Sequence, residues 1–208
     1  MENLSAQLVD YGVAAAALSG ESQSGDEYLV QSFADGVLVA VVDGLGHGGE
    51  AAEAARIAVQ TLRENASESV IALARRCHKD LQRSRGVVMS LARFDATDSS
   101  MTWMGVGNVG GLLIHAGDSA DNELPDREVL LMRSGVVGSA LPALRASVIS
   151  ILKGDTLILA TDGVSENFSD GITVTDPAQK IADRILSNHN KGTDDALVLV
   201  VHFLAESI

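Results

Sequence analysis

Short apolar runs that stop at Gly, Asp or Ser recur along this chain and limit the folds open to it. The longest uninterrupted runs have about eight residues, whereas a helix needs about 20 to cross a bilayer. Most are rich in Val and Ile, which is typical of strands in a layered core. The runs that predict strands are Leu8–Leu18, Tyr28–Ala34, Val37–Val42, Val87–Phe94, Met101–Val106, Gly111–His115, Val129–Met132, Ala146–Leu152, Thr156–Ala160 and Ala196–Phe203.

Apolar residues at a spacing of about 3.6 predict helices instead. The segments with this spacing are Glu50–Asn65, Ser67–Leu81 and Pro177–His189. In the third segment we expect Asp176 to cap the helix, Pro177 to take its first position and Gln179 to complete a capping box.

The order of these elements predicts an α+β fold. Two helices interrupt a long series of strands, and one more helix precedes the last strand, which is too few helices for a doubly wound parallel sheet. Two mostly antiparallel sheets with helices packed outside account better for the order. With 208 residues and 3% aromatics, we expect one domain whose core consists of Ala, Val, Leu and Ile. Polar residues predict an exposed loop over Gly117–Arg127.

The charge and the cysteine content narrow the possible partners and compartments. The net charge of −13, from 28 acidic and 15 basic residues, argues against nucleic acid as a partner because the phosphates would be repelled. The single cysteine, Cys77, excludes an intrachain disulfide and lies on the apolar face of a predicted helix. The N-terminus has no basic segment followed by an apolar run. We therefore expect a soluble cytoplasmic protein that does not interact with membranes.

Four aspartates stand next to predicted strands, each beside a glycine or another turn residue. They are Asp26 in SGDEY, Asp43 in VVDGLGHG, Asp162 in LATDGVSE and Asp194 in GTDDAL. A strand-ending turn would explain any one of them, since Asp-Gly is a common turn pair. Asp195, the neighbour of Asp194, is a rival for any role assigned to Asp194.

Hairpin geometry predicts which aspartates meet. If Asp35–Gly36 centres a tight turn, Asp43 lies opposite Tyr28 and Asp26 lies just beyond, at the same sheet edge. At the other end of the chain, a turn at Lys153–Gly154 leads into Thr156–Ala160. That strand then ends near Asp162, and the last strand starts near Asp194. If these two strands are antiparallel neighbours, Asp162 and Asp194 also meet.

Carboxylates gathered at one edge repel each other unless cations neutralise them. Oxygen ligands at turn positions suit hard cations such as Mg²⁺ or Mn²⁺. Two such ions share a bridging water, lower its pKa and hold a phosphoryl group for in-line attack, so that no nucleophilic side chain is needed.

Four motifs in order, VVDGLGHGGEAAEAA, GVGN, LATDGVSE and TDDALVLVV, resemble those of the metal-dependent protein serine/threonine phosphatases, the PPM family. The resemblance extends from SGDEY to the last strand. Small size, the DGLGHG form of the first motif and GVGN resemble the stand-alone bacterial stress-signalling phosphatases of the RsbX type. The resemblance implies one domain over residues 1–208 with four αββα layers, an antiparallel β-sandwich flanked by helices.

The resemblance also implies roles for individual residues. Asp43 would bridge two divalent cations, Mn²⁺ or Mg²⁺, and the carbonyl of Gly44 would bind one of them. Asp162 and Asp194 would hold the other, and Asp26 would act at the edge of the site, directly or through a water. Asp43, Asp162 and Asp194 are thus the expected catalytic residues. The implied substrate is phosphoserine or phosphothreonine on a stress-signalling scaffold or anti-sigma-factor antagonist, and a monomer is expected.

The chain also departs from the family pattern. Gly25 stands where many relatives have an acidic residue, and 21–23 lack the arginine that grips the phosphate in many of them. Asn108 replaces an aspartate that supports a third metal in some members, so two metals are expected. His47 lies four residues after Asp43 rather than two, which favours a solvated loop histidine over a general acid.

These departures leave a second hypothesis, a catalytically silent module that binds the same phosphoprotein. A metal-dependent phosphodiesterase or nuclease is disfavoured by the charge. Only about nine residues separate Asp162 from the segment that starts at Gly171, so we expect the flap subdomain of larger members to be reduced or missing.

Overall fold

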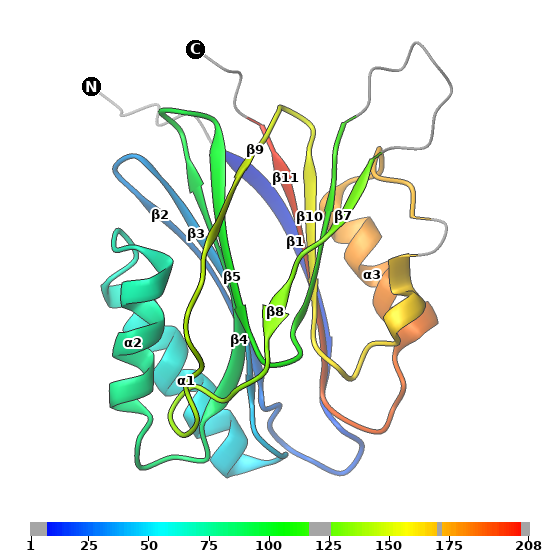
Figure 1. Cartoon of the computed structure of the whole chain (residues 1–208). Coiled ribbons are helices and arrows are strands. Elements are labelled where there is room, and N and C mark those ends of the chain that lie inside the picture. The colour runs from blue at the N-terminus through cyan, green and yellow to red at the C-terminus, as the bar shows by residue number, and fades with distance from the viewer. Residues whose placement is uncertain (1–7, 117–125, 170–171, 205–208) are drawn as a thin grey trace, which may run out of the picture.

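Two β-sheets pack face to face, with helices on the outer side of each, in a computed structural model that describes residues 8–116, 126–169 and 172–204 (Figure 1). Helices α1 (Gly49–Glu64) and α2 (Val70–Asp80) cover one sheet, and α3 (Ala178–His189) covers the other. The predicted α+β fold with four αββα layers is therefore confirmed.

The sheet next to α3 has the strand order β1-β11-β10-β6-β7, and all its pairs are antiparallel. Its strands are β1 (Val9–Ala16), β6 (Gly110–Ile114), β7 (Arg127–Val129), β10 (Thr156–Ala160) and β11 (Ala196–Phe203). Strands β10 and β11 are direct antiparallel neighbours, as the placement of Asp162 beside Asp194 requires.

The sheet next to α1 and α2 has the order β2-β3-β4-β5-β8, and β9 also pairs with β5. Its strands are β2 (Asp26–Phe33), β3 (Gly36–Gly44), β4 (Val87–Asp95), β5 (Ser100–Val106), β8 (Met132–Arg133) and β9 (Ser147–Ser150). The pair β5–β8 is parallel, and the other pairs are antiparallel.

Strand alternation sorts the core into three buried clusters, since successive side chains point to opposite faces. In β3, Val37, Val39 and Val41 face the other sheet. The intervening Leu38, Ala40 and Val42 face α1 and α2. A third cluster lies between the other sheet and α3. Because the core is aliphatic and small, helices approach the sheets closely.

Helix α3 approaches the backbone of β1 closely at Gly12. A Cβ placed on Gly12 would stand 2.1 Å from the backbone nitrogen of Gln179, in the first turn of α3. The side chain of Gln179 also accepts a hydrogen bond from Val13 N–H and donates one to Val13 carbonyl oxygen. These bonds fix α3 to the edge strand.

Because Gln179 bonds to β1, the capping box predicted for α3 is wrong. The N-cap is Pro177, with no side-chain cap hydrogen bond, and Asp176 instead binds Lys180 and Arg184. In α2, by contrast, Ser69 is an N-cap whose hydroxyl accepts from Ala72 N–H. Cys77 of α2 is fully buried, and burial raises the pKa of its thiol to about 12.

Two strand predictions need correction. The run Val129–Met132 is not one strand, because β7 ends at Val129 in one sheet and β8 begins at Met132 in the other. The turn at Lys153–Gly154 likewise carries the chain from β9 in one sheet to β10 in the other. Both connections cross between sheets, and local sequence carries no signal for that.

The loop predicted over Gly117–Arg127 lies mostly outside the described residues, and Arg127 itself begins β7. Among the helices of the described part, none is long and apolar enough to span a bilayer.

Candidate metal centre

The four predicted aspartates lie at one end of the sandwich, which we call the aspartate rim: Asp26, Asp43, Asp162 and Asp194. Asp26 starts β2 and Asp43 lies near the end of β3, while Asp162 follows β10 and Asp194 precedes β11. Since β2–β3 and β10–β11 are antiparallel pairs, the start of one strand lies beside the end of its partner. Two sheets thus contribute two aspartates each.

Asp26 and Asp43 are direct cross-strand partners. Side chains in such a pair point to the same face, with Cβ atoms about 5 Å apart. The register differs by two residues from the prediction, which put Tyr28 opposite Asp43. The observed turn is centred on Ala34–Asp35, with Phe33 paired to Gly36, rather than on Asp35–Gly36. The shift brings the two carboxylates closer than expected.

Burial and mutual repulsion raise the pKa of both carboxyl groups. Burial is the main cause that raises the pKa of Asp43 to about 8, and the charges of Asp26, Asp162, Asp194 and Asp195 add to it. Burial also raises the pKa of Asp26 to about 7, against the opposing effect of a hydrogen bond from Thr161. Among the described residues, every charge that shifts these two pKa values is a carboxylate. The charges that act on Asp26 and Asp43 are therefore all negative.

Thr161 joins the two sheets at the rim. Its hydroxyl donates to Asp26 Oδ2 at 2.7 Å, and the hydroxyl oxygen of Thr161 accepts from Leu197 N–H at 2.8 Å. Thr161 is buried, and it continues the inward-facing alternation of Leu157 and Leu159 in β10. It thereby fixes the orientation of the Asp26 carboxylate.

Asp162 is exposed beyond the end of β10, and one of its oxygens is held. Asn108, which follows β5, donates from Nδ2 to Asp162 Oδ2 at 2.6 Å. Lys191 Nζ donates to the backbone carbonyl of Asp162 at 2.7 Å. The second carboxylate oxygen of Asp162 remains available to a ligand. Asn108, which stands where some relatives have an aspartate, thus orients a predicted metal ligand.

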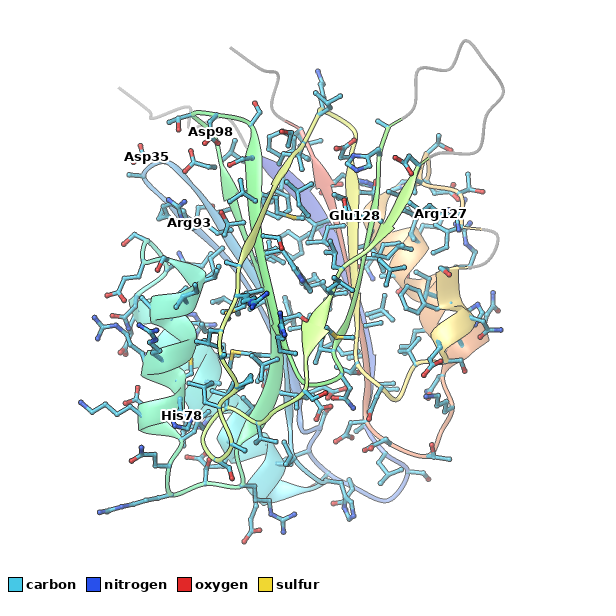
Figure 2. The ribbon with its side chains drawn as sticks, viewed as in Figure 1. Asp35, His78, Arg93, Asp98, Arg127 and Glu128 are labelled. Carbon is cyan, nitrogen blue, oxygen red and sulfur yellow. The ribbon has the colours of Figure 1, made fainter. Side chains whose placement is uncertain are left out.

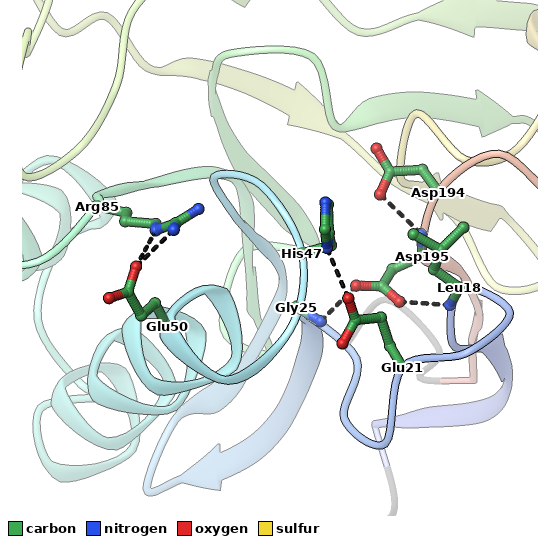
Figure 3. Close-up of polar contacts among 8 residues, drawn as sticks. All are labelled: Leu18, Glu21, Gly25, His47, Glu50, Arg85, Asp194 and Asp195. Atoms are coloured by element: carbon green, nitrogen blue, oxygen red, sulfur yellow. Dashed lines mark hydrogen bonds and ion pairs between the residues drawn. The ribbon is translucent and has the colours of Figure 1, made fainter.

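Asp194 and Asp195, the two candidates for one ligand position, have different hydrogen-bond partners. Asp195 is buried, and its two carboxylate oxygens accept from Leu18 N–H and Gly25 N–H, each at 2.7 Å (Figure 3). Asp194 is half-buried, and its Oδ1 accepts only from Asp195 N–H at 2.9 Å. Asp195 is thus committed to holding two loops, and Asp194 keeps a free oxygen at the rim.

Gly44 and Gly25 bring backbone close to the carboxylates. Gly44 N–H donates to Gly25 carbonyl oxygen at 3.0 Å, and a Cβ on Gly44 would stand 2.1 Å from the carbonyl oxygen of Ala51 in α1. A Cβ on Gly25 would stand 3.3 Å from both Gly44 carbonyl oxygen and Asp195 Oδ2. Glycine at both positions therefore allows α1 to approach β3 and the loop before β2 to approach the Gly44 carbonyl.

His47 and Arg85 flank the rim on the side of α1. His47 is exposed, and its Nδ1 lies 2.7 Å from Glu21 Oε1, in the segment where an arginine was expected (Figure 3). Arg85 forms an ion pair with Glu50 at 2.5 Å, in the first turn of α1. Both side chains are engaged with glutamates, so neither is poised as a general acid.

The donor set of the rim fits a hard divalent cation by its chemistry. The donors are carboxylate oxygens and one carbonyl, and their charge is unbalanced. Within residues 8–116, 126–169 and 172–204, no three His, Cys, Asp or Glu side chains are already arranged to enclose an ion.

Sequence reasoning missed the parts played by Thr161 and Asp195. A usable signal exists, since Asp195 shares the parity of Leu197 and Leu199, which face the other sheet. Thr161 shares the parity of Leu157 and Leu159 in the same way. Extending strand alternation one step past the strand ends would have predicted both as inward-facing polar residues.

Comparisons with known proteins agree with this architecture. Residues 34–204 match the family model described as stage II sporulation protein E, SpoIIE. Phosphoserine phosphatase RsbX of Bacillus subtilis (strain 168) is 29% identical over 147 residues, which is 70% of each chain.

Solved structures share the fold. One, described under "The bacterial stressosome: a modular system that has been adapted to control secondary messenger signaling", is 26% identical with a TM-score of 0.82, over 93% of this chain and 99% of the other. RsbX in complex with magnesium is 21% identical with a TM-score of 0.81, over 94% and 95% of the two chains.

Proposed function

The chain belongs to the SpoIIE family, and on that premise we propose that it is a metal-dependent phosphatase acting on phosphoserine or phosphothreonine of a partner protein. The observation that carries the proposal is the aspartate rim, where two sheets bring four carboxylates to one end of the sandwich. Such a rim favours the binding of divalent cations, and cations favour the binding of phosphate.

In this proposal two ions, Mn²⁺ or Mg²⁺, occupy the rim. Asp43, the carbonyl of Gly44, Asp162 and Asp194 would hold the ions, and Asp26 would act at the edge of the site. Bound there, the ions supply an activated water and neutralise the charge of the phosphoryl group. Asp43 suits the central place because it receives no hydrogen bond from any described residue. Its proton must leave before a cation binds, since its pKa is raised to about 8.

The surrounding residues keep these ligands in position. Thr161 holds one oxygen of Asp26, and Asn108 holds one oxygen of Asp162, which leaves the other oxygen of each free. Asp195 ties Leu18 and Gly25 to the start of β11 and so keeps the loop before β2 against the rim. Hydrogen bonds of this kind commonly orient metal ligands in proteins.

The substrate and setting follow from the relatives. RsbX is named a phosphoserine phosphatase, and a structure of similar fold belongs to work on the bacterial stressosome. We accordingly propose that the substrate of this chain is a phosphorylated stress-signalling protein, either a scaffold or an anti-sigma-factor antagonist. The proposal includes a cytoplasmic monomer whose residues 1–208 form one phosphatase domain.

The direct test is hydrolysis of p-nitrophenyl phosphate with Mn²⁺ or Mg²⁺, with and without EDTA. We expect turnover that EDTA abolishes. Asp43→Asn should lower kcat by about 100-fold or more while preserving the fold, because it removes a bridging ligand and relieves repulsion. The matched control is Asp35→Asn, an exposed residue at the far end of the same hairpin (Figure 2), which should retain full activity. Turnover that persists in EDTA would refute the metal mechanism.

The second candidate is a silent module that binds the phosphoprotein without cleaving it. It is favoured by Glu21, which pairs with His47 in the segment where the family places a phosphate-binding arginine. Calorimetric titration with Mn²⁺ discriminates the two. Binding of the ion that Asp43→Asn removes supports the enzyme, and a flat titration supports the module.

A further inference from the structure

A cavity of about 540 Å³ opens beside the aspartate rim, on the outer face of the sheet that α3 covers. Asn108, Thr161 and Asp162 belong both to its wall and to the predicted metal centre or its support. The cavity is therefore continuous with the place where the phosphate is proposed to bind. Nothing assigned so far makes use of it.

The rest of the wall is largely apolar. Leu112 and Val129, which are direct cross-strand partners in β6 and β7, lie on one side. Val164 and Phe168 lie on the other side, and Met132 of β8 completes the opening. Val129 is 72% exposed, and the adjacent Leu131 is 87% exposed. Apolar side chains that remain exposed beside a cavity mark a place where a ligand covers them.

Hydrogen bonds hold the described residues that follow β10 around the cavity. The 3-10 helix η1 (Glu166–Ser169) makes one wall, and Arg127 of β7 donates to the carbonyl of Ser169 across it at 2.5 Å. Lys191 N–H bonds to Gly163 carbonyl oxygen, and Ser165 N–H bonds to that of His189. These hydrogen bonds connect the described residues around the opening of the cavity.

The charges of the wall decide what kind of group enters. Lys191 is the one cation among the described residues that line the cavity, and its ammonium is already bonded to the Asp162 carbonyl. The guanidinium of Arg127, which does not line the cavity, is bonded to the Ser169 carbonyl. Glu166 and Asp162 are acidic, so a second phosphate or another anion would be repelled. The wall therefore favours the binding of an uncharged, apolar group.

We propose that this cavity receives an apolar side chain of the phosphoprotein substrate, a few residues away from the phosphorylated serine or threonine. The inference rests on the proposed function, because the phosphorylated residue must occupy the rim at the same time. Strand residues rise about 3.3 Å each, so an extended peptide passing from the rim over Asp162 reaches the cavity within a few residues. The site thereby selects among phosphoproteins by the residue that flanks the phosphate.

The test uses synthetic phosphoserine peptides that differ only in one flanking residue, Leu or Ser, placed in turn at each of three positions on either side. We expect one position at which Leu raises kcat/KM about tenfold over Ser, the usual effect of filling an apolar pocket. Equal kcat/KM for Leu and Ser at every position would overturn the proposal.

Two variants locate the effect. Val129→Ser removes apolar surface from the cavity wall, and we expect it to lower kcat/KM for the Leu peptide about threefold to tenfold. Val148→Ser is the matched control, because Val148 is 71% exposed on β9 and does not line the cavity. Val148→Ser should leave turnover of p-nitrophenyl phosphate and of the Leu peptide unchanged. Equal losses in both variants would overturn the assignment to this cavity.

Failure of the inference and failure of the proposed function give different results. If p-nitrophenyl phosphate and all peptides are left intact, the phosphatase assignment fails, and fluorescence anisotropy of the labelled Leu and Ser peptides still tests the cavity. Tighter binding of the Leu peptide that Val129→Ser weakens supports it. Equal binding of the two peptides refutes it.

Discussion

At the scale of single residues, two adjacent aspartates have different tasks, and the contacts of their oxygens tell them apart. Asp195→Asn would place an amide N–H₂ against a backbone N–H, since both oxygens of Asp195 accept from buried or half-buried donors. We expect a loss of about 1–3 kcal/mol in the free energy of unfolding. Asp194→Asn keeps an oxygen for Asp195 N–H and should leave stability almost unchanged while weakening metal binding. Urea unfolding and Mn²⁺ titration of both variants check this. The reverse pattern would make Asp195 the metal ligand.

At the scale of elements, glycines set how closely helices approach sheets. Gly12→Ala would push a Cβ into the backbone of α3, where Ala178 and Gln179 lie within 2.5 Å of the added atom. Backbone cannot yield as a flexible side chain does, so we expect a loss of about 1–3 kcal/mol in the free energy of unfolding. Gly49→Ala, at the start of α1, meets nothing within 4 Å and should be neutral or slightly stabilising. Urea unfolding midpoints compare the two, and equal midpoints would contradict the close packing of α3 on β1.

At the scale of the whole molecule, the rim links stability to pH. The folded protein raises the pKa of Asp26 to about 7 and of Asp43 to about 8, from 3.8. Between about pH 4 and pH 8 the native state binds more protons at Asp26 and Asp43 than the unfolded chain does. The stabilisation that these protons provide is full below about pH 4 and is lost as the pH rises through 7 and 8.

We expect the melting temperature in EDTA to fall between about pH 5 and pH 9, and Asp43→Asn to flatten that slope. Added Mn²⁺ should oppose the fall, because the ion binds the deprotonated rim. Thermal melts with and without the ion measure both effects. A slope in EDTA that Asp43→Asn leaves unchanged would locate the linkage elsewhere.

The sequence by itself determined the elements and the end of the sandwich at which the chemistry lies. Strand period and turn residues are local signals, so β10 and β11 have the predicted bounds, and their antiparallel pairing puts Asp162 and Asp194 at the same end of the sheet. The motifs that resemble the phosphatases placed Asp26, Asp43 and Gly44 at the same end as this second pair. The metal roles assigned to these residues stay predictions.

The tertiary structure alone decided the remaining details, because they depend on contacts between distant segments. The register of β2 on β3 is shifted by two residues because the turn is centred on Ala34–Asp35, and a shift of two leaves each side chain on the same face of the sheet. The switch of sheets between β7 and β8 and the bonds of Gln179 to β1 depend on neighbours far along the chain. Asp195 binds the loop that contains Leu18 and Gly25 only because the fold brings the N–H groups of those two residues to its carboxylate. Short-range preferences cannot specify such contacts, since their free energy arises only when the packed layers come together.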